Sequence, residues 1–286
     1  MTLSLVLAGS ACISWDSGWG DIPGPAGEDE VAPLLARAGQ WARQADSAER
    51  LEVVVATYEA ALRREPDNLE ALSNLAMYRT LLGAGYREGA DDKGEQYRAA
   101  IRYAERIMYR NPEFRRRVEQ GQDVWDAAAV LTAAEADGMG WWTTAMFYYF
   151  KECVPGVLKI FNNRWIGRNK QIMDRLDTVA PKWHGGANYF NYGIYYLALP
   201  ESVGGDMTRS ARYLERARTL RPDRLLVPWG RAKYYHYKRG DRRGFERDLR
   251  WVLARDVRSP TVDPYPWNVY FQREARQLLR DADRLF

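Results

Sequence analysis

The sequence is poor in the residue types from which most catalytic and metal sites are built. Its 286 residues include only two histidines, His184 and His236, which are far apart in the chain. It contains no HExxH, CxxC, GxGxxG or P-loop motif, so the spacings typical of zinc hydrolases, thiol redox sites and nucleotide sites are missing. We therefore expect no enzyme, no metal site and no cofactor. We interpret His184, next to two glycines, as a loop or cap residue and His236, among tyrosines, as a packed ring.

Long apolar runs and clusters of one charge are also missing. No stretch of 18 or more apolar residues occurs, so we expect no membrane-spanning helix. The chain has 42 basic residues, of which seven are lysine, and 38 acidic residues. The net charge is therefore +4, and the charged residues are spread along the chain. Without a basic arm or a recognition-helix signature, we expect no nucleic-acid partner. The arginines indicate solvated faces or, alternatively, a basic surface that meets an acidic partner or a membrane.

Cysteine is scarce, and one of the two cysteines lies in a segment typical of export. Leu5 to Ala11 is apolar and then small, and it directly precedes Cys12, as at the end of a lipoprotein signal. Gly9 stands where leucine is usual, and the positively charged start is missing, which an upstream start codon would explain. We interpret residues 1–11 as a signal segment and Cys12 as a lipid anchor.

The segment after Cys12 supports the same interpretation. Residues 12–30 are rich in glycine and include two prolines, which is typical of a flexible tether. The expected location is the periplasm, with the lipid anchor in the outer membrane. The alternative is a disordered N-terminus on a cytoplasmic protein with two reduced thiols. If Cys12 is acylated, Cys153 has no disulfide partner and is expected to be a small buried hydrophobe.

What the chain does contain is a residue spacing pattern, here called the cadence, that occurs three times. Each copy has two small or apolar residues three positions apart and a proline five positions later, which places both on one helical face and ends the helix. The three copies are Tyr58-Ala61-Pro66, Ala104-Ile107-Pro112 and Leu214-Ala217-Pro222. This spacing is typical of the second helix of a tetratricopeptide repeat. Such arrays hold or bind other molecules rather than catalyse.

The cadence predicts an all-α fold: a tetratricopeptide-like helix-turn-helix array that forms a superhelix, with no sheet, as one domain over residues 31–286. We expect helix ends at Gly83–Gly85, a linker at Gly89–Gly94 and a last paired helix at Asp123–Ala136. The remaining helices expected before Gly138 are Val31–Ala42, Ala48–Arg64, Leu69–Leu82, Tyr97–Arg110 and Glu113–Gln120.

Aromatic residues are concentrated between Gly138 and Pro200, where fourteen occur. Because residues 147–150 are aromatic all round a helix, some rings must face something other than the repeat core. They either fill the inside of a broad superhelix or line a cleft for an apolar ligand. The candidate lining rings are Trp141, Trp142, Phe147, Tyr148, Phe150, Trp165, Tyr189, Phe190 and Tyr192. Arg164 or Asn188 would orient a polar head.

Residues from Gly186 to Ala254 resemble the T component of TRAP transporters, a family of periplasmic helical lipoproteins. The resemblance rests on a helix ending at Leu199-Pro200, the Gly204-Gly205-Asp206 loop, a helix with Ala211, Leu214 and Ala217, and Phe245-x3-Leu249-x2-Val252. With the Trp141-Trp142 segment and the Ala61 repeat it extends over roughly residues 40–280. In the loop we expect the two glycines to allow positive φ and close backbone approach, and Asp206 to cap the next helix.

The resemblance implies an accessory transport protein that binds small organic ligands or the periplasmic binding protein that carries them. A related group handles sterol-like lipids. The aromatic content favours a carrier of a hydrophobic or amphipathic small molecule, a lipid with sterol-like molecules as one option. The alternative is a tetratricopeptide scaffold that docks the binding protein of a TRAP-type organic-acid transporter. Expected partners are thus a hydrophobic small molecule, the binding protein or another transport subunit, the membrane through the anchor, and a second copy of the chain in a homo-oligomer.

Overall fold

The computed structural model describes residues 30–162, 164–259 and 263–286, and these residues form helices connected by turns. Within these ranges no strand occurs, so the predicted all-helical array is confirmed. Cys12 and the signal and tether segments before Glu30 lie outside the described residues. The lipid anchor therefore stays a prediction.

The elements follow one another with short connections. In chain order they are α1 (Val31–Ala42), α2 (Ala48–Leu62), α3 (Leu69–Tyr86), α4 (Ala90–Tyr109), α5 (Pro112–Glu119), α6 (Val124–Ala127), η1 (Ala128–Val130), η2 (Ala133–Glu135), α7 (Ala136–Glu152), α8 (Gly156–Phe161), α9 (Arg164–Val179), η3 (Trp183–Gly185), α10 (Ala187–Ala198), η4 (Glu201–Val203), α11 (Met207–Leu220), α12 (Leu226–Gly230), η5 (Arg231–His236), α13 (Arg242–Leu253), α14 (Tyr265–Arg280) and α15 (Ala282–Leu285). Of the η elements, η1 to η4 are 3₁₀ turns and η5 is a π-helical segment that continues α12.

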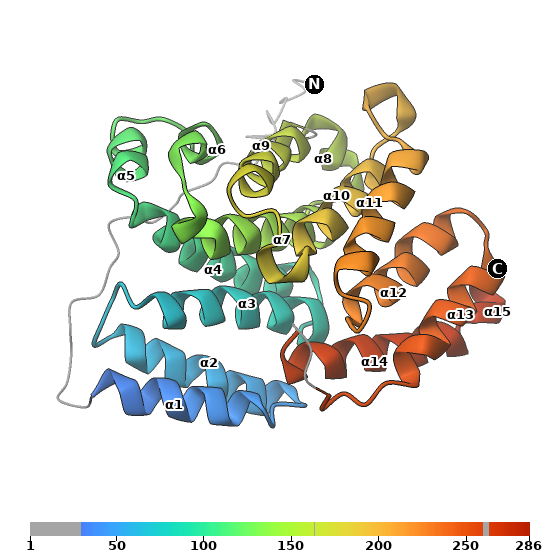
Figure 1. Cartoon of the computed structure of the whole chain (residues 1–286), viewed down its shortest axis with the longest axis horizontal. Helices are drawn as coiled ribbons and strands as arrows, with labels where there is room; N and C mark the ends of the chain where they lie inside the picture. Colours follow the sequence, from blue (N-terminus) through green and yellow to red (C-terminus); the bar gives the residue numbers. More distant parts are fainter. Residues whose placement is uncertain (1–29, 163, 260–262) are drawn as a thin grey trace, which may run out of the picture.

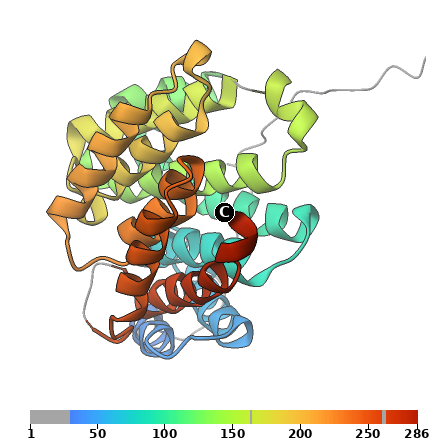
Figure 2. The same cartoon turned by 90° about the vertical axis from the view of Figure 1, so that its right-hand side faces the viewer.

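Neighbouring helices pack in sequence, and the chain then returns on itself. α1 packs on α2, α2 on α3, α3 on α4 and α4 on α7, which produces the layers seen in Figure 1. α10 packs on α11, and α13 on α14. Both views place α14 beside the ends of the first helices (Figures 1 and 2). There Arg273 donates a hydrogen bond to the carbonyl of Gly85 at the end of α3.

The small and apolar residues of the threefold cadence are all buried. Tyr58 and Ala61 lie in the core of α2, Ala104 and Ile107 in that of α4, and Leu214 and Ala217 in that of α11. Each proline follows the end of its helix, as predicted, because its ring cannot continue the hydrogen-bond ladder. In the loop before α11, Gly204 has φ of 98° and Asp206 Oδ1 accepts a hydrogen bond from the Arg209 N–H at 2.8 Å. The predicted cap is thus confirmed.

Two glycine-based predictions were wrong. Gly83 and Gly85 do not end α3, and Gly94 lies inside α4 rather than in a linker. At Gly83 a Cβ atom would come within 2.5 Å of the Tyr97 ring of α4. Glycine is required there because two helices approach closely, and not because the helix stops.

The predicted helix Asp123–Ala136 was also wrong. The chain forms α6 and two 3₁₀ turns there, and α7 begins at Ala136 and continues through Gly138. The reason is a local capping box, in which the Glu135 carboxylate accepts a hydrogen bond from the Thr132 N–H at 2.7 Å. This exchange stabilises a new helix start in the middle of the expected helix.

Candidate functional site

A cavity of about 790 Å³ lies between α7 and the C-terminal helices. Its wall is built by side chains from α7, α8, α9, α10, α12, η5, α14 and α15, with the turn η3. Most of the exposed wall is apolar and much of it is aromatic. Its size lies within the roughly 300–1,000 Å³ of small-molecule sites.

One face of α7 forms the long wall of the cavity. Trp141, Thr144, Tyr148 and Lys151 all line it, with spacings of three, four and three residues. Such spacings place side chains on one helical face. Since a helix rises about 1.5 Å per residue, the wall from Trp141 to Lys151 is about 15 Å long.

Indole rings from three elements meet at one end of this wall, which we call the tryptophan end: Trp141, Trp183 and Trp267. The ring centroids of Trp141 lie 5.6 Å from Trp183 and 6.5 Å from Trp267. Trp183 Nε1 donates to Asp137 Oδ1 at 2.7 Å, which fixes the indole in place. These rings give the tryptophan end an apolar wall of defined shape.

His184 lies at the tryptophan end in an unusual backbone conformation. It is the one non-glycine residue with positive φ in the described ranges, at 41°. Its carbonyl accepts a hydrogen bond from Arg224 Nη1 at 2.6 Å, and Arg224 forms a buried ion pair with Asp263. A strained residue persists only where its surroundings hold it. Here the Arg224–Asp263 pair does so and also forms part of the cavity wall.

Lysines and a tyrosine form the opposite end of the α7 wall, which we call the lysine end: Lys151, Lys159, Lys233 and Tyr234. Lys151 Nζ donates to the Tyr234 hydroxyl at 3.0 Å, and Lys159 Nζ donates to the carbonyl of Lys151 at 2.7 Å. Burial lowers the pKa of Lys151 and raises that of Tyr234 to about 12. The lysine end thus combines three partly buried cations, of which Lys233 forms an ion pair with Glu274.

The structure places six of the residues predicted from the sequence on the cavity wall: Trp141, Phe147, Tyr148, Phe150, Trp165 and Phe190. Phe147 and Phe150 are only partly buried, although they lie in the middle of the aromatic segment. Their remaining exposed surface includes the cavity wall, as expected for rings that face something other than core. That they bind a ligand stays a prediction.

The other five predicted residues do not line the cavity. Trp142 is fully buried and donates to Glu105 at 2.9 Å, while Asn188 donates to the carbonyl of Met173 at 3.0 Å. Tyr189 and Tyr192 both stack on Tyr213 of α11. Arg164 is exposed at the start of α9. These residues pack α4, α9, α10 and α11 together or face solvent.

Sequence reasoning missed the wall contributed by the C-terminal helices. Trp267 and Phe271 of α14 and Lys233 of η5 line the cavity. The i, i+4 spacing of Trp267 and Phe271 puts both rings on one face of α14, but a periodic apolar face is also typical of a helix that packs in the core. No local pattern indicated that this face meets α7, more than 110 residues earlier.

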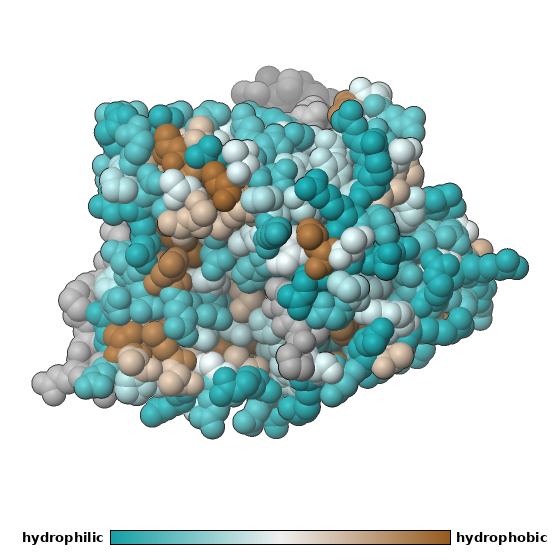
Figure 3. All heavy atoms as spheres, viewed as in Figure 1, coloured by the Kyte–Doolittle hydropathy of each residue, from teal (hydrophilic) through white to brown (hydrophobic). Residues whose placement is uncertain are grey.

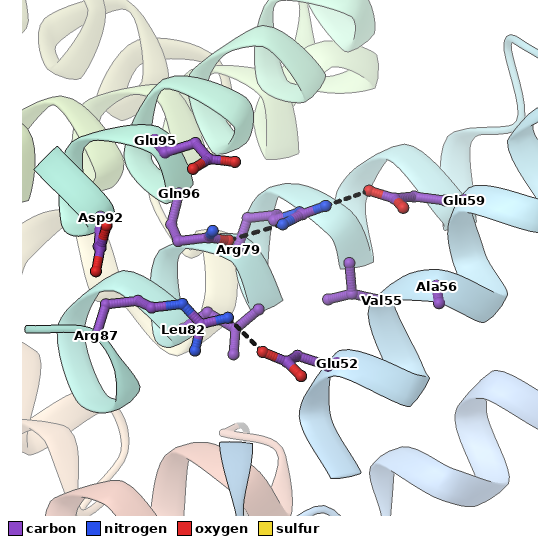
Figure 4. Close-up of a pocket in the computed structure, with 10 residues that line it drawn as sticks. All are labelled: Glu52, Val55, Ala56, Glu59, Arg79, Leu82, Arg87, Asp92, Glu95 and Gln96. Carbon is purple, nitrogen blue, oxygen red and sulfur yellow. Dashed lines mark hydrogen bonds and ion pairs between the residues drawn. The ribbon is translucent and has the colours of Figure 1, made fainter. Parts of the chain in front are cut away.

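A second, polar groove of about 500 Å³ lies between α2, α3 and α4. Figure 4 shows Arg79 paired with Glu59 and Arg87 paired with Glu52 across it. Asp92 and Glu95 of α4 complete the rim, and no ion pair joins either of them to another described residue. The groove therefore carries an excess of negative charge.

The profile of the TRAP transporter T-component family matches residues 93–286. This range contains the whole described wall of the aromatic cavity. The chain belongs to the T-component family of TRAP transporters. No curated protein sequence matches it. As a T component, the protein is a transporter-associated accessory subunit of the periplasm that works with other transporter subunits.

In the part of the chain that the structure describes, the surface and the titratable groups of this T component show little else that resembles a site. One face is largely hydrophilic, with its hydrophobic residues in separate patches (Figure 3). Among the described residues no helix is both long and apolar enough to cross a bilayer. In the same ranges no group of three or more His, Cys, Asp or Glu could hold a metal ion. His236 is buried between Asp241 and Asp248, at 2.7 and 3.2 Å.

Proposed function

We propose that this T component holds a hydrophobic or amphipathic small molecule, such as a lipid or a sterol-like compound, in the aromatic cavity. The cavity itself carries the proposal: about 790 Å³ of space with a mainly apolar wall. An apolar wall offers few hydrogen bonds to water, whereas an apolar ligand is stabilised by about 25 cal/mol for each Å² of apolar surface that it buries. The lipid anchor at Cys12 belongs to the same proposal, since it would keep this carrier at the outer membrane.

The contrast among neighbouring rings of α7 supports a binding site over a packed core. Trp142 is 0% exposed and has a hydrogen-bond partner, as a core ring should. Phe147 and Phe150 keep exposed surface and line the cavity. Interiors are close-packed, so a space of this size among aromatic rings is more typical of a ligand site than of a core. Nothing in the proposal requires a catalytic step.

Binding of a neutral fluorescent probe, N-phenyl-1-naphthylamine, tests this function. We expect Phe147→Ala and Phe150→Ala each to weaken probe binding by about ten-fold, because each removes a ring that contacts the ligand. The matched control is Tyr149→Ala in the same turn. Tyr149 is partly buried, lies under Arg98 at 5.8 Å and does not line the cavity.

Unfolding midpoints separate loss of binding from loss of fold. If all three variants bind the probe as the wild type does while differing in stability, the rings are core and the proposal fails. Mass spectrometry of a solvent extract of the purified protein gives a second readout. A co-purified apolar molecule, reduced in the Phe150→Ala protein, is the expected result.

A second candidate function is docking of the transporter's periplasmic binding protein, and the polar groove favours it. Asp92 and Glu95 lie on its rim without ion-pair partners among the described residues. Surface charges of one sign steer a partner of opposite charge and fix its orientation. In this case the groove would receive basic side chains of the binding protein, and charge reversal at its rim would weaken the complex.

A further inference from the structure

Resting on the proposed carrier function, we infer that the cavity ligand is an amphipathic anion whose acidic head group binds at the lysine end. The distribution of lysine in the chain points to this. Four of the seven lysines, Lys151, Lys159, Lys233 and Lys238, line the cavity. Among the described lining residues the only carboxylate is that of Asp263, which is paired with Arg224.

Two of these lysines, Lys151 and Lys233, lie around one side chain, Tyr234. Lys151 Nζ lies 4.5 Å from the centroid of the Tyr234 ring, and Lys233 Nζ lies 5.9 Å from the same centroid. Lys159 joins them through its hydrogen bond to the carbonyl of Lys151. Two ammonium groups therefore lie around one phenol, and a third lies beside the backbone of Lys151. An anionic group in this part of the wall can contact more than one donor.

The protein compensates these charges only in part. Lys233 Nζ forms an ion pair with Glu274 Oε2 at 2.5 Å, whereas Lys151 and Lys159 are compensated less. The nearest carboxylate to Lys151 is Glu152 at 3.8 Å, and Glu152 is itself closer to Lys93, at 3.0 Å, and to the Tyr97 hydroxyl, at 2.8 Å. Lys159 donates to a backbone carbonyl and forms no ion pair with another described residue. Burial of a cation without a full counter-charge is unfavourable. A bound anion would remove that penalty.

The backbone of η5 is a second, independent observation. Lys233 and Tyr234 both line the cavity. They lie in the π-helical segment Arg231–His236. A π turn widens the helix and changes which residues share a face, and such turns occur often at functional sites. The departure from α-helical geometry thus falls at the residues that form the lysine end.

The rest of the wall decides the shape of the ligand. From Lys151 the α7 wall continues for about 15 Å to the tryptophan end, with Phe147, Tyr148 and Thr144 between. An acid group at Lys151 would leave its apolar body along these rings. The ligand class is therefore an aliphatic or fused-ring molecule with one acidic group, a carboxylate or a sulfonate or phosphate ester.

Three twelve-carbon probes with different head groups test this inference: dodecanoate, dodecan-1-ol and dodecylammonium. Each is titrated against the protein loaded with N-phenyl-1-naphthylamine, below its micelle concentration. We expect dodecanoate to displace the dye at least ten times more effectively than the alcohol, and dodecylammonium to be the weakest, because charge-assisted hydrogen bonds favour the anion.

Lysine variants locate the head group. Lys151→Met and Lys159→Met keep the length of the side chain and remove its charge, and each should weaken dodecanoate by about ten-fold while changing dodecan-1-ol less than three-fold. The control Lys182→Met removes a charge from an exposed residue off the cavity and should change neither. Equal affinity for the acid and the alcohol, or equal effects of Lys151→Met on both, overturns the inference but leaves the carrier function. If neither the dye nor any of the three probes binds, both are wrong.

Discussion

At the scale of single residues, Asp137 of α7 holds two residues of the tryptophan end in place. Its carboxylate accepts hydrogen bonds from Ser73 at 2.6 Å and from Trp183 Nε1 at 2.7 Å, and it lies 3.3 Å from His184 Nε2. Burial would raise the pKa of Asp137, but hydrogen bonds from His184, Ser73 and Trp183 hold it at about 2. One ionised carboxylate thus fixes two residues of the cavity wall.

This pKa predicts a pH-dependent contribution to stability. Because the pKa in the folded state is lower than the ordinary value of 3.8, the contribution is complete above about pH 4 and is lost as pH falls towards 2. The lowered pKa corresponds to about 1–2 kcal/mol of stability, once solvent screening of the 34% exposed side chain is allowed for. We expect Asp137→Asn to lower the free energy of unfolding by this amount at pH 7.

Urea unfolding of both proteins at pH 7 and pH 2.5 provides the measurement. The difference between wild type and Asp137→Asn should shrink at pH 2.5, where the wild-type carboxyl is partly protonated. Asp91→Asn at the exposed start of α4 serves as the control and should change stability little. A difference for Asp137→Asn that is the same at both pH values would mean that its charge is not what matters.

Residue-level reasoning from the sequence reached part of the cavity. The run of aromatics at 147–150 cannot all face one core, and the structure places Phe147, Tyr148 and Phe150 on the cavity wall. The same reasoning selected Tyr189 and Tyr192, whose rings stack on Tyr213 instead. The sequence indicates that each ring packs against something. Whether it packs against the cavity or against another helix depends on how α10 packs on α11, which the sequence does not indicate.

At the scale of helices, local hydrogen bonding was readable from the sequence and close packing was not. Asp206 caps α11 through the backbone three residues on, which a short motif reveals. Gly83 has the same local signature as a helix end, yet it lies inside α3. Its reason is the Tyr97 ring of α4, which no neighbour in sequence indicates.

We therefore predict that Gly83→Ala changes the free energy of unfolding in the opposite direction from Gly→Ala at an ordinary helical position. Alanine in a helix interior is usually favoured over glycine by about 1 kcal/mol. At Gly83 the new methyl group would lie 2.5 Å from the Tyr97 ring, so we expect Gly83→Ala to destabilise the protein by about 1–3 kcal/mol. The control is Gly39→Ala in α1, where the nearest atoms are 4.0 Å away.

Thermal unfolding of the two variants decides the matter. Gly39→Ala should raise the midpoint and Gly83→Ala should lower it. Tyr97→Leu removes a buried ring and its hydrogen bond to Glu152, so it is destabilising by itself. In the Tyr97→Leu protein, however, Gly83→Ala should cost less than it does in the wild type, because the leucine side chain is smaller than the ring. Stabilisation by Gly83→Ala would show that α3 and α4 can separate without cost.

At the scale of the whole molecule, the return of α14 to α3 distinguishes this chain from an open array of repeats. In an open array each unit contacts only its neighbours. Here Arg273 lies 4.3 Å from the centroid of the Tyr86 ring and donates to the Gly85 carbonyl, 188 residues away. Because α14 also carries Trp267 and Phe271, this closure completes the cavity. The repeat cadence predicts neighbouring contacts, so the closure could not be read from it.

The two candidate sites lie on different parts of the closed molecule. The described wall of the aromatic cavity belongs entirely to residues matched by the family, whereas eight of the ten residues that line the polar groove precede residue 93. No residue lines both sites, so we expect changes at one of them to affect the other little.

This independence predicts how docking and carrying can be separated. We expect the double variant Asp92→Lys, Glu95→Lys to weaken association with the transporter's periplasmic binding protein by about ten-fold, mainly through a slower on-rate, since the groove's excess negative charge is reversed. Displacement of the dye by dodecanoate should stay unchanged. The control Glu30→Lys, Glu201→Lys alters net charge equally at exposed positions off the groove. Surface plasmon resonance at low and physiological salt measures both variants. If they weaken the complex equally, net charge alone is responsible and the groove is not the docking site.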